Sequence, residues 1–234
     1  MSVVIVGVYR HRYAENTRRL LEPALAAGWP TAWWALEEPH PALAEFTVGQ
    51  GRDWRIPLMN RAIEHLGEPV EWTVLADDDI RFVRGDVVKL RDICEQLRYD
   101  LAQPARERGT HISHDITRRA RLSRARQTSW IESGPLTVIG PRYRDCILPM
   151  PPERKMGWGI EIDWFKLHLE QGAELGIVDA MPIIHFGEKS YDYREMNREL
   201  KAELVEYGHP YWVGMRETLA TWRLWQRRAP WLDS

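Results

Sequence analysis

Three consecutive acids, Asp77-Asp78-Asp79, directly follow a mostly apolar run at residues 70–76. This run has the composition of a buried strand, and ligands of open α/β sheets bind outside the carboxyl ends of strands. In extended chain Asp77 and Asp79 point to the same side, and their carboxylates repel each other unless a cation neutralises them. The alternative is a solvated turn in which one Asp caps the next helix. The buried run before the acids favours a site for a divalent cation.

A second group of candidate residues lies in Met156–Trp164, where a Gly-Trp-Gly sequence centred on Trp158 precedes Glu161 and Asp163. Glycines allow close approach of backbone to a ligand, and an indole face can stack on a sugar ring. Both acids begin a predicted helix, where the helix dipole alone also favours carboxylates. Residues two apart on a helix point about 200° apart, so only one of them can face a cleft. Asp163 can pair with Lys166, and Glu161 is therefore the predicted inward carboxylate.

The third candidate is His185, which lies near the end of a mostly apolar run, Ile177–Phe186. A single histidine in such a place is more often a hydrogen-bonded core residue than a ligand. The acids predicted at the same sheet favour a contact of His185 with a metal ion or a diphosphate.

The order of elements predicts how these residues are brought together. Strands are predicted at 3–8, 31–36 and 70–76, and helices at 16–27, 57–66 and 86–98. Strand–helix alternation of this kind predicts a doubly wound α/β sheet in the first hundred residues. Further predicted elements are a strand at 129–139, a helix ending near 171, a strand at 177–186, and a C-terminal helix whose apolar stripe is Trp212, Met215, Leu219 and Trp222.

Composition limits the function classes. The 234 residues carry 32 basic and 34 acidic side chains, so a protein that binds polyanions over its whole surface is excluded. Twelve tryptophans and a basic set dominated by arginine favour stacked and bidentate recognition of sugars, phosphates and carboxylates. Residues 104–128 hold seven arginines against two acids, a local charge of +5. We expect this segment to be flexible and to clamp a diphosphate or close over the site.

Taken in order, these motifs resemble a GT-A-fold glycosyltransferase and are most similar to the family 2 rhamnosyltransferase-like group. The resemblance covers about residues 1–195 and implies a GT-A-like doubly wound mixed sheet with helices on both faces. Residues 1–195 would be the catalytic domain, with a nucleotide-binding half at 1–100 and an acceptor-binding half at 101–195. Residues 196–234 would be a C-terminal helical extension packed on it.

The resemblance also implies roles for individual residues. A Mn²⁺ or Mg²⁺ ion on the diphosphate would be held by Asp77 and Asp79, with His185 assisting. Glu161 occupies the position of the family's catalytic base, and Asp163 matches the acid that follows it. The residues implied to bind the nucleotide sugar are Val8, Tyr9, Arg10, Glu37, Gly51, Arg52, Asn60, Asp77, Asp78 and Trp158.

The implied reaction moves a hexosyl or deoxyhexosyl group, with inversion, from a UDP-, GDP- or dTDP-sugar to a hydroxyl of a glycan or lipid-linked acceptor. One alternative is a nucleotidyltransferase acting on sugar phosphates, although the segment after the first strand, Val8–Tyr13, lacks the glycines of a phosphate loop. Others are a non-catalytic sugar-nucleotide sensor, or nucleic-acid binding through residues 104–128. Trp130 is the only aromatic residue near that segment, so nucleic acid is not an expected partner.

The expected location is the cytoplasm. Two distant cysteines without C-x-x-C spacing indicate a reduced protein, and no run approaches the roughly 20 apolar residues of a membrane span. Trp222, Trp225 and Trp231 are interleaved with arginines and could rest on a membrane surface beside a lipid-linked acceptor. For the stripe of Trp212, Met215, Leu219 and Trp222, packing on the sheet is the favoured interpretation.

Overall fold

The computed structural model describes residues 2–67, 70–110, 112–187 and 216–232, together with the single positions Arg194, Arg198, Ala202 and Val205. Within these residues one sheet has the strand order β10-β7-β9-β6-β8-β4-β1-β2-β3, and β5 pairs with β9. The strands are β1 Val3–Tyr9, β2 Thr31–Ala35, β3 Thr47–Gln50, β4 Trp72–Asp77, β5 Ile80–Phe82, β6 Leu101–Arg106, β7 Ser123–Thr128, β8 Leu136–Ile139, β9 Leu175–His185 and β10 Thr218–Arg223. The helices are α1 Ala14–Ala26, α2 Arg55–His65, α3 Val87–Gln96, α4 Arg144–Ile147 and α5 Ile160–Gln171.

The N-terminal half of the sheet is parallel. β1 pairs with β2 and β4, and β2 pairs with β3, all in parallel, so the carboxyl ends of these strands share one edge. Every residue of β1 is buried, as expected for a strand covered on both faces. Gly7 lies where a Cβ would come within 2.3 Å of the Ala76 carbonyl oxygen and 2.4 Å of the Trp33 ring. The glycine therefore permits the close packing of β1 between its neighbours.

The second half of the sheet is mixed. β8 runs antiparallel to β4 and β6, β9 is parallel to β6, and β7 is antiparallel to β9. The short β5 pairs with the end of β9 and sets Ile80 opposite His185. Because Ile80 follows the acidic triplet, this pairing carries His185 to the edge where the acids lie.

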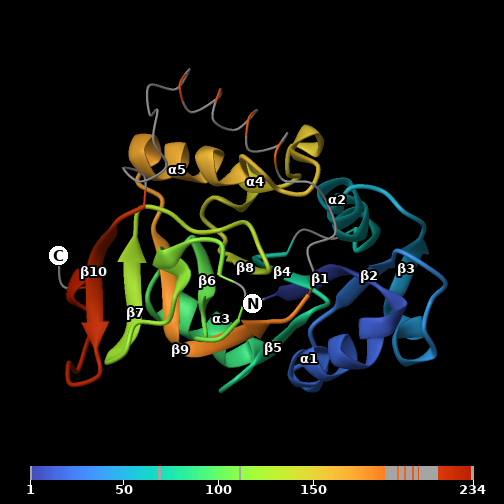
Figure 1. Ribbon diagram of the computed structural model, residues 1–234, viewed down its shortest axis with the longest axis horizontal. Coiled ribbons are helices and arrows are strands. Elements are labelled where there is room, and N and C mark those ends of the chain that lie inside the picture. The colour runs from blue at the N-terminus through green and yellow to red at the C-terminus, as the bar shows by residue number, and fades with distance from the viewer. Residues whose placement is uncertain are drawn as a thin grey trace.

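Helices cover both faces of the sheet (Figure 1). One apolar core includes residues of α1 and α3, such as Leu21 and Leu90, and the other includes residues of α2 and α5, such as Met59 and Trp164. The predicted doubly wound mixed α/β sheet with helices on both faces is thus confirmed. None of the helices in the described ranges combines the length and the apolar character that crossing a bilayer requires.

Two predicted elements were wrong. Residues 218–223, expected to be helical, form β10, which pairs antiparallel with β7 and sets Trp222 opposite Ala125. The i, i+3 spacing of Leu219 and Trp222 fits a helix, but the unpaired edge of β7 provides backbone partners that spacing cannot reveal. Residues 129–135 are a loop, and only 136–139 of the predicted strand at 129–139 form one. Trp212, Met215 and about half of the expected extension at 196–234 lie outside the described residues.

The arginine-rich segment is held in the sheet at both of its ends, and its expected role as a clamp over the site stays a prediction. Its two ends are β6 and β7, and Arg106 and Arg126 are buried in them. Arg126 donates to both carboxylate oxygens of the fully buried Asp179, and Arg119 pairs with Glu107. Ion pairs with acids of the fold therefore hold Arg119 and Arg126, whereas Arg108, Arg118, Arg121 and Arg124 remain exposed.

Candidate active site

The acidic triplet is held through its backbone by three other parts of the chain. The Asp77 amide donates to the Pro135 carbonyl, and the Asp79 carbonyl accepts from the Phe186 amide. Asn16 lies inside α1 and donates its side-chain amide to the carbonyls of Asp78 and Ile80, both at 2.8 Å. The turn is thus fixed from both halves of the sheet, which sets where each carboxylate points.

Arg10 neutralises part of the triplet from the end of β1. Its amide and its Nη2 donate to Asp78 at 2.6 Å, and Nη2 also donates to Asp79 Oδ2 at 2.6 Å. Burial raises the pKa of Asp78 to about 6 despite the opposing effect of Arg10. Burial would also raise the pKa of Asp79, but the neighbouring His185 and Arg10 outweigh it and lower that pKa to about 2. Asp79 is therefore the more strongly ionised of the two.

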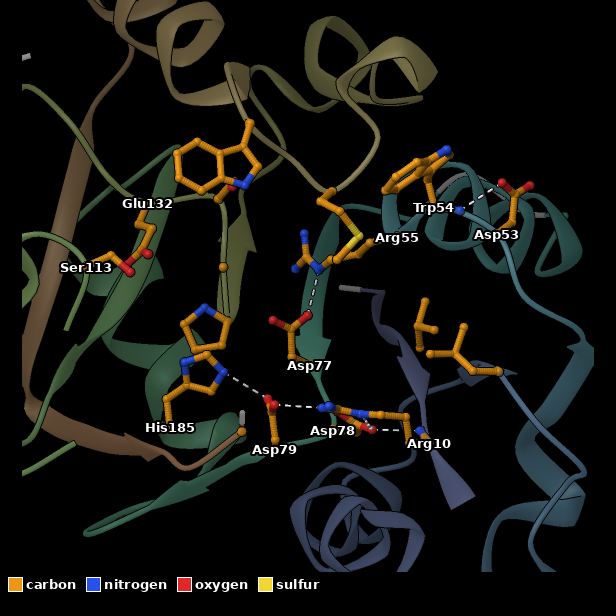
Figure 2. Close-up of a pocket in the computed structure, with 18 of the residues that line it drawn as sticks. Arg10, Asp53, Trp54, Arg55, Asp77, Asp78, Asp79, Ser113, Glu132 and His185 are labelled. Atoms are coloured by element: carbon orange, nitrogen blue, oxygen red, sulfur yellow. Dashed lines mark hydrogen bonds and ion pairs between the residues drawn. The ribbon is translucent and has the colours of Figure 1, made fainter. Parts of the chain in front are cut away.

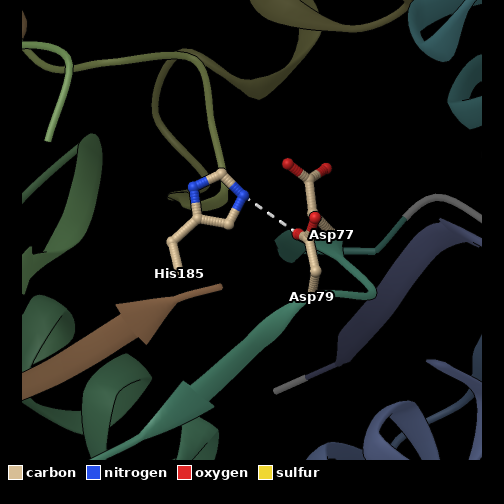
Figure 3. Close-up of side chains that lie close together, drawn as sticks. All are labelled: Asp77, Asp79 and His185. Atoms are coloured by element: carbon tan, nitrogen blue, oxygen red, sulfur yellow. Dashed lines mark ion pairs between the residues drawn. The ribbon is translucent and has the colours of Figure 1, made fainter. Parts of the chain in front are cut away.

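Asp77, Asp79 and His185 form a cluster in which one ligand atom from each lies within 4.8 Å of the others (Figure 3). Asp79 Oδ1 is buried and lies 3.0 Å from His185 Nε2. Carboxylate oxygens with one imidazole nitrogen are a donor set that suits Mn²⁺ and, through the oxygens, Mg²⁺. Two carboxylates and an imidazole held this close together fit a divalent cation.

The other ring nitrogen of His185 faces Arg106. Arg106 Nη1 lies 2.8 Å from His185 Nδ1, and its Nη2 donates to Glu132 at 2.6 Å. A guanidinium can only donate, so in this arrangement Nδ1 accepts and Nε2 carries the ring proton toward Asp79. In this arrangement only the two aspartates can bind a cation. His185 can join them after its contact with Arg106 is released, because the ring proton can then move from Nε2 to Nδ1.

Gly187 packs directly on Asp79. A Cβ at Gly187 would lie 1.6 Å from Asp79 Oδ2, so Gly187→Ala must displace that carboxylate. We expect Mn²⁺ affinity to fall by about 10–100-fold, the usual effect of misorienting a ligand. Calorimetric titration with Mn²⁺ measures this, and Phe186→Leu at the adjacent exposed position is the control. Equal affinities in wild type and Gly187→Ala would contradict the role of Asp79 as a ligand.

Glu161 lies in the first turn of α5 and is buried. Its Oε1 accepts from the Ser133 hydroxyl at 2.9 Å and the Ser133 amide at 3.2 Å, and Oε2 accepts from the Gly159 amide. Burial raises the pKa of Glu161 to about 7; these hydrogen bonds oppose the rise and the charge of Glu132 adds to it. A carboxylate with this pKa can exchange protons near neutral pH.

A cavity of about 650 Å³ joins these groups. Figure 2 shows Asp77 and Asp79 between a side that carries Glu132 and Ser113 and an opposite side that carries Trp54 and Asp53. The lining brings together ten of the residues singled out from sequence: Val8, Arg10, Glu37, Arg52, Asp77, Asp78, Asp79, Trp158, Glu161 and His185.

Four of the residues singled out are not in the lining. Tyr9 is fully buried in the core and its hydroxyl bonds to Thr47. Asn60 exchanges hydrogen bonds with the backbone of Met150, and Asp163 pairs with Arg154. Gly51 lies beside the cavity residue Arg52 but does not line the cavity itself. In this structure Tyr9, Asn60 and Asp163 contact other parts of the fold and do not face the cavity.

Other lining residues were not anticipated. Arg55 and Glu132 belong to segments that the sequence presented as the loop before a helix and as a strand, whereas Arg106 comes from the arginine-rich segment that was expected at the site. His114 also lines the cavity, and burial lowers its pKa to about 4, so it is neutral at pH 7. Only the Arg-Asp-Trp-Arg run at 52–55, next to a glycine-rich loop, was a visible signal. Nothing in the spacing marked the others, because their partners are distant in sequence.

The mixed sheet with helices on both faces has the GT-A fold. No protein-family model matches the chain, and no curated protein matches its sequence. Among solved structures, the chain is similar to GalNAc-T7 with UDP, GalNAc and Mn²⁺, with a TM-score of 0.59, 10% identity, and coverage of 92% of this chain and 49% of that one. It is also similar to S. aureus TarS 1-349 in complex with UDP-GlcNAc, with a TM-score of 0.54, 11% identity, and coverage of 88% and 67%.

The chain thus spans about half the length of GalNAc-T7 and two thirds of that TarS chain. At identities this low the likeness establishes the GT-A fold.

Proposed function

We propose that this protein is a metal-dependent glycosyltransferase that moves a sugar from a nucleoside-diphosphate sugar to an acceptor hydroxyl, with inversion. The observation that carries the proposal is the meeting, in one cavity, of the Asp77–Asp79–His185 cluster with the buried carboxylate of Glu161. The GT-A neighbours with bound UDP or UDP-GlcNAc support the substrate class. Membership of the family 2 rhamnosyltransferase-like group, as the motif order suggests, is part of this proposal.

Each side of the cavity has a part in the reaction. Asp77 and Asp79, joined by His185, would hold Mn²⁺ or Mg²⁺, and a bound ion supplies positive charge against the charge that forms on the departing diphosphate. Trp158 offers an indole face to the sugar. As the acceptor oxygen bonds to the anomeric carbon, the bond from that carbon to the diphosphate breaks, and Glu161 takes the acceptor proton. Ser133 and the Gly159 amide keep the Glu161 carboxylate in place.

The pH dependence of turnover follows from Glu161. A base must be ionised, so kcat/KM is expected to rise with pH and level off above about pH 7, the pKa of Glu161. Because the charge of Glu132 helps to raise that pKa, Glu132→Gln should move the rise to lower pH. Initial-rate profiles of both proteins measure the shift. A profile that is flat across neutral pH in the wild type is incompatible with Glu161 as the base.

Nucleotide binding provides the first test of function. Thermal unfolding is followed with UDP-, GDP- and dTDP-sugars, each with and without Mn²⁺, and a transfer assay follows for any donor that raises Tm. We expect one base to stabilise the protein, and more strongly with Mn²⁺ than without. Absence of a shift with every donor would contradict the proposal. A shift with nucleoside triphosphates and release of pyrophosphate would indicate the nucleotidyltransferase alternative.

A further inference from the structure

Arg55, the first residue of α2, has hydrogen-bonding capacity that the described fold does not use. The residue is only 9% exposed. Its Nε donates to Asp77 Oδ1 at 2.6 Å, but no described residue accepts a hydrogen bond from Nη1 or Nη2, and Nη2 is buried. A buried guanidinium without acceptors costs free energy, because water no longer satisfies its N–H groups. This free energy is recovered when a ligand oxygen reaches the guanidinium.

The surroundings of Arg55 show where such a ligand would lie. A Cβ at Gly157 would stand 3.5 Å from Nη1 and 2.9 Å from the Ser133 hydroxyl, and a Cβ at Gly134 would stand 3.6 Å from Nη2. Ser133 is the residue that holds Glu161. Arg55 therefore lies between Asp77, on the metal side, and the loop that positions the proposed base. Figure 2 shows its guanidinium beside Asp77, within the pocket.

The other arginines of the cavity are committed elsewhere. Arg10 donates to Asp78 and Asp79, and Arg106 donates to Glu132. Arg52 is exposed and pairs with Glu37. Arg55 alone combines burial, a charge next to the metal-side acids, and terminal nitrogens that no described residue engages. An acceptor-only group with several oxygens matches these donors best.

We propose that Arg55 is a catalytic residue that binds the diphosphate of the donor and donates hydrogen bonds to it as the glycosidic bond breaks. The electron pair of that bond passes to a diphosphate oxygen, Arg55 stabilises the resulting charge without losing a proton, and the acceptor proton goes to Glu161. This inference rests on the proposed function for the identity of the ligand. The binding of an oxyanion at Arg55 is testable without any sugar transfer.

The decisive probe is inorganic pyrophosphate, titrated by calorimetry in EDTA so that no metal contributes. Arg55→Gln would also leave the Asp77 carboxylate unpaired. The comparison is therefore made in the Asp77→Asn background, where a neutral amide replaces that carboxylate. We expect the double variant to bind pyrophosphate on the order of 30-fold more weakly than Asp77→Asn alone, because it lacks the charged hydrogen bonds that Arg55 donates. Arg61→Gln removes a charge from the exposed face of the same helix and is the matched control.

Equal pyrophosphate affinity with and without Arg55 overturns the proposal. A loss confined to UDP-glucuronate, with UDP-glucose and pyrophosphate unaffected, overturns it in favour of a carboxylate on the sugar. If Arg55→Gln lowers Tm, Arg55→Lys, which keeps the charge, is measured instead. Wild-type pyrophosphate affinity together with wild-type kcat in Arg55→Lys would show that the guanidinium is not required and would overturn the proposal.

For a donor that is turned over, Arg55→Lys is expected to lower kcat by about 10²–10³-fold with a smaller change in KM. Pyrophosphate binding that depends on Arg55, together with no change in Tm with any nucleotide sugar, would support an oxyanion site at Arg55. The same result would contradict the glycosyltransferase proposal.

Discussion

Glu161→Gln is expected to lower kcat by about 10²–10⁴-fold, the usual contribution of a general base. Glutamine keeps the size of the side chain and can still accept from Ser133 through its carbonyl oxygen, but it cannot take the acceptor proton. Donor binding depends on other residues of the cavity and should change little. The measurements are kcat at saturating donor and acceptor, and donor affinity by calorimetry.

Two companion variants make this result specific to Glu161. Asp163 pairs with Arg154 and does not line the cavity, so Asp163→Asn should not reproduce the loss. Glu132 lines the cavity with a carboxylate paired to Arg106, so Glu132→Gln tests the remaining acid on that side. Turnover of Glu161→Gln near the wild-type rate, or a loss only in Asp163→Asn, would show that the base has been misassigned.

Asp79→Asn is expected to remove most metal-stimulated activity, a loss of about 100-fold or more, since a metal's charge stabilisation amounts to several kcal/mol. The neutral amide is a weaker ligand, and Mn²⁺ affinity should fall in parallel. Titration of activity and of heat against Mn²⁺ concentration measures both effects.

Asp78→Asn is the matched comparison within the same triplet. Asp78 is buried and accepts three hydrogen bonds from Arg10, so its loss should lower Tm rather than the affinity for Mn²⁺. Removing one partner of a buried ion pair costs about 3–5 kcal/mol when the other charge is left unpaired, and the cost here should be smaller because Arg10 keeps its contact with Asp79. If Asp79→Asn left Mn²⁺ dependence intact while Asp78→Asn abolished it, the assignment of the two acids would be reversed.

Elements with strong local signals were predictable from sequence. Val3–Tyr9 is apolar throughout and forms a strand buried on both faces, and the run before Asp77 forms β4. The alternation of such strands with amphipathic helices predicted the doubly wound half of the sheet. The C-terminal strand β10 was missed because its pairing with β7 joins residues about ninety positions apart, which no local pattern encodes.

The cavity was predictable only where a motif marked it. Residue type and spacing indicated three of its parts: the adjacent acids, the Gly-Trp-Gly segment and the strand-end histidine. Arg55 and Glu132 are ordinary surface-type residues in the sequence. They become site residues because β4, β8 and the start of α2 converge, which buries them beside Asp77 and His185.

By itself the sequence determined the apolar segments that form β1, β2, β4 and much of β9, and the presence of three acids at a strand end, because hydrophobic periodicity and charge spacing are local properties. The tertiary structure decided what each charge does. It turned Asp78 toward Arg10 and Asp79 toward His185, and it placed Glu161 in the lining of the cavity and Asp163 outside it. The reason is that pairing and burial depend on residues that are distant in sequence, and these set both the free energy of a charge and the direction in which it points.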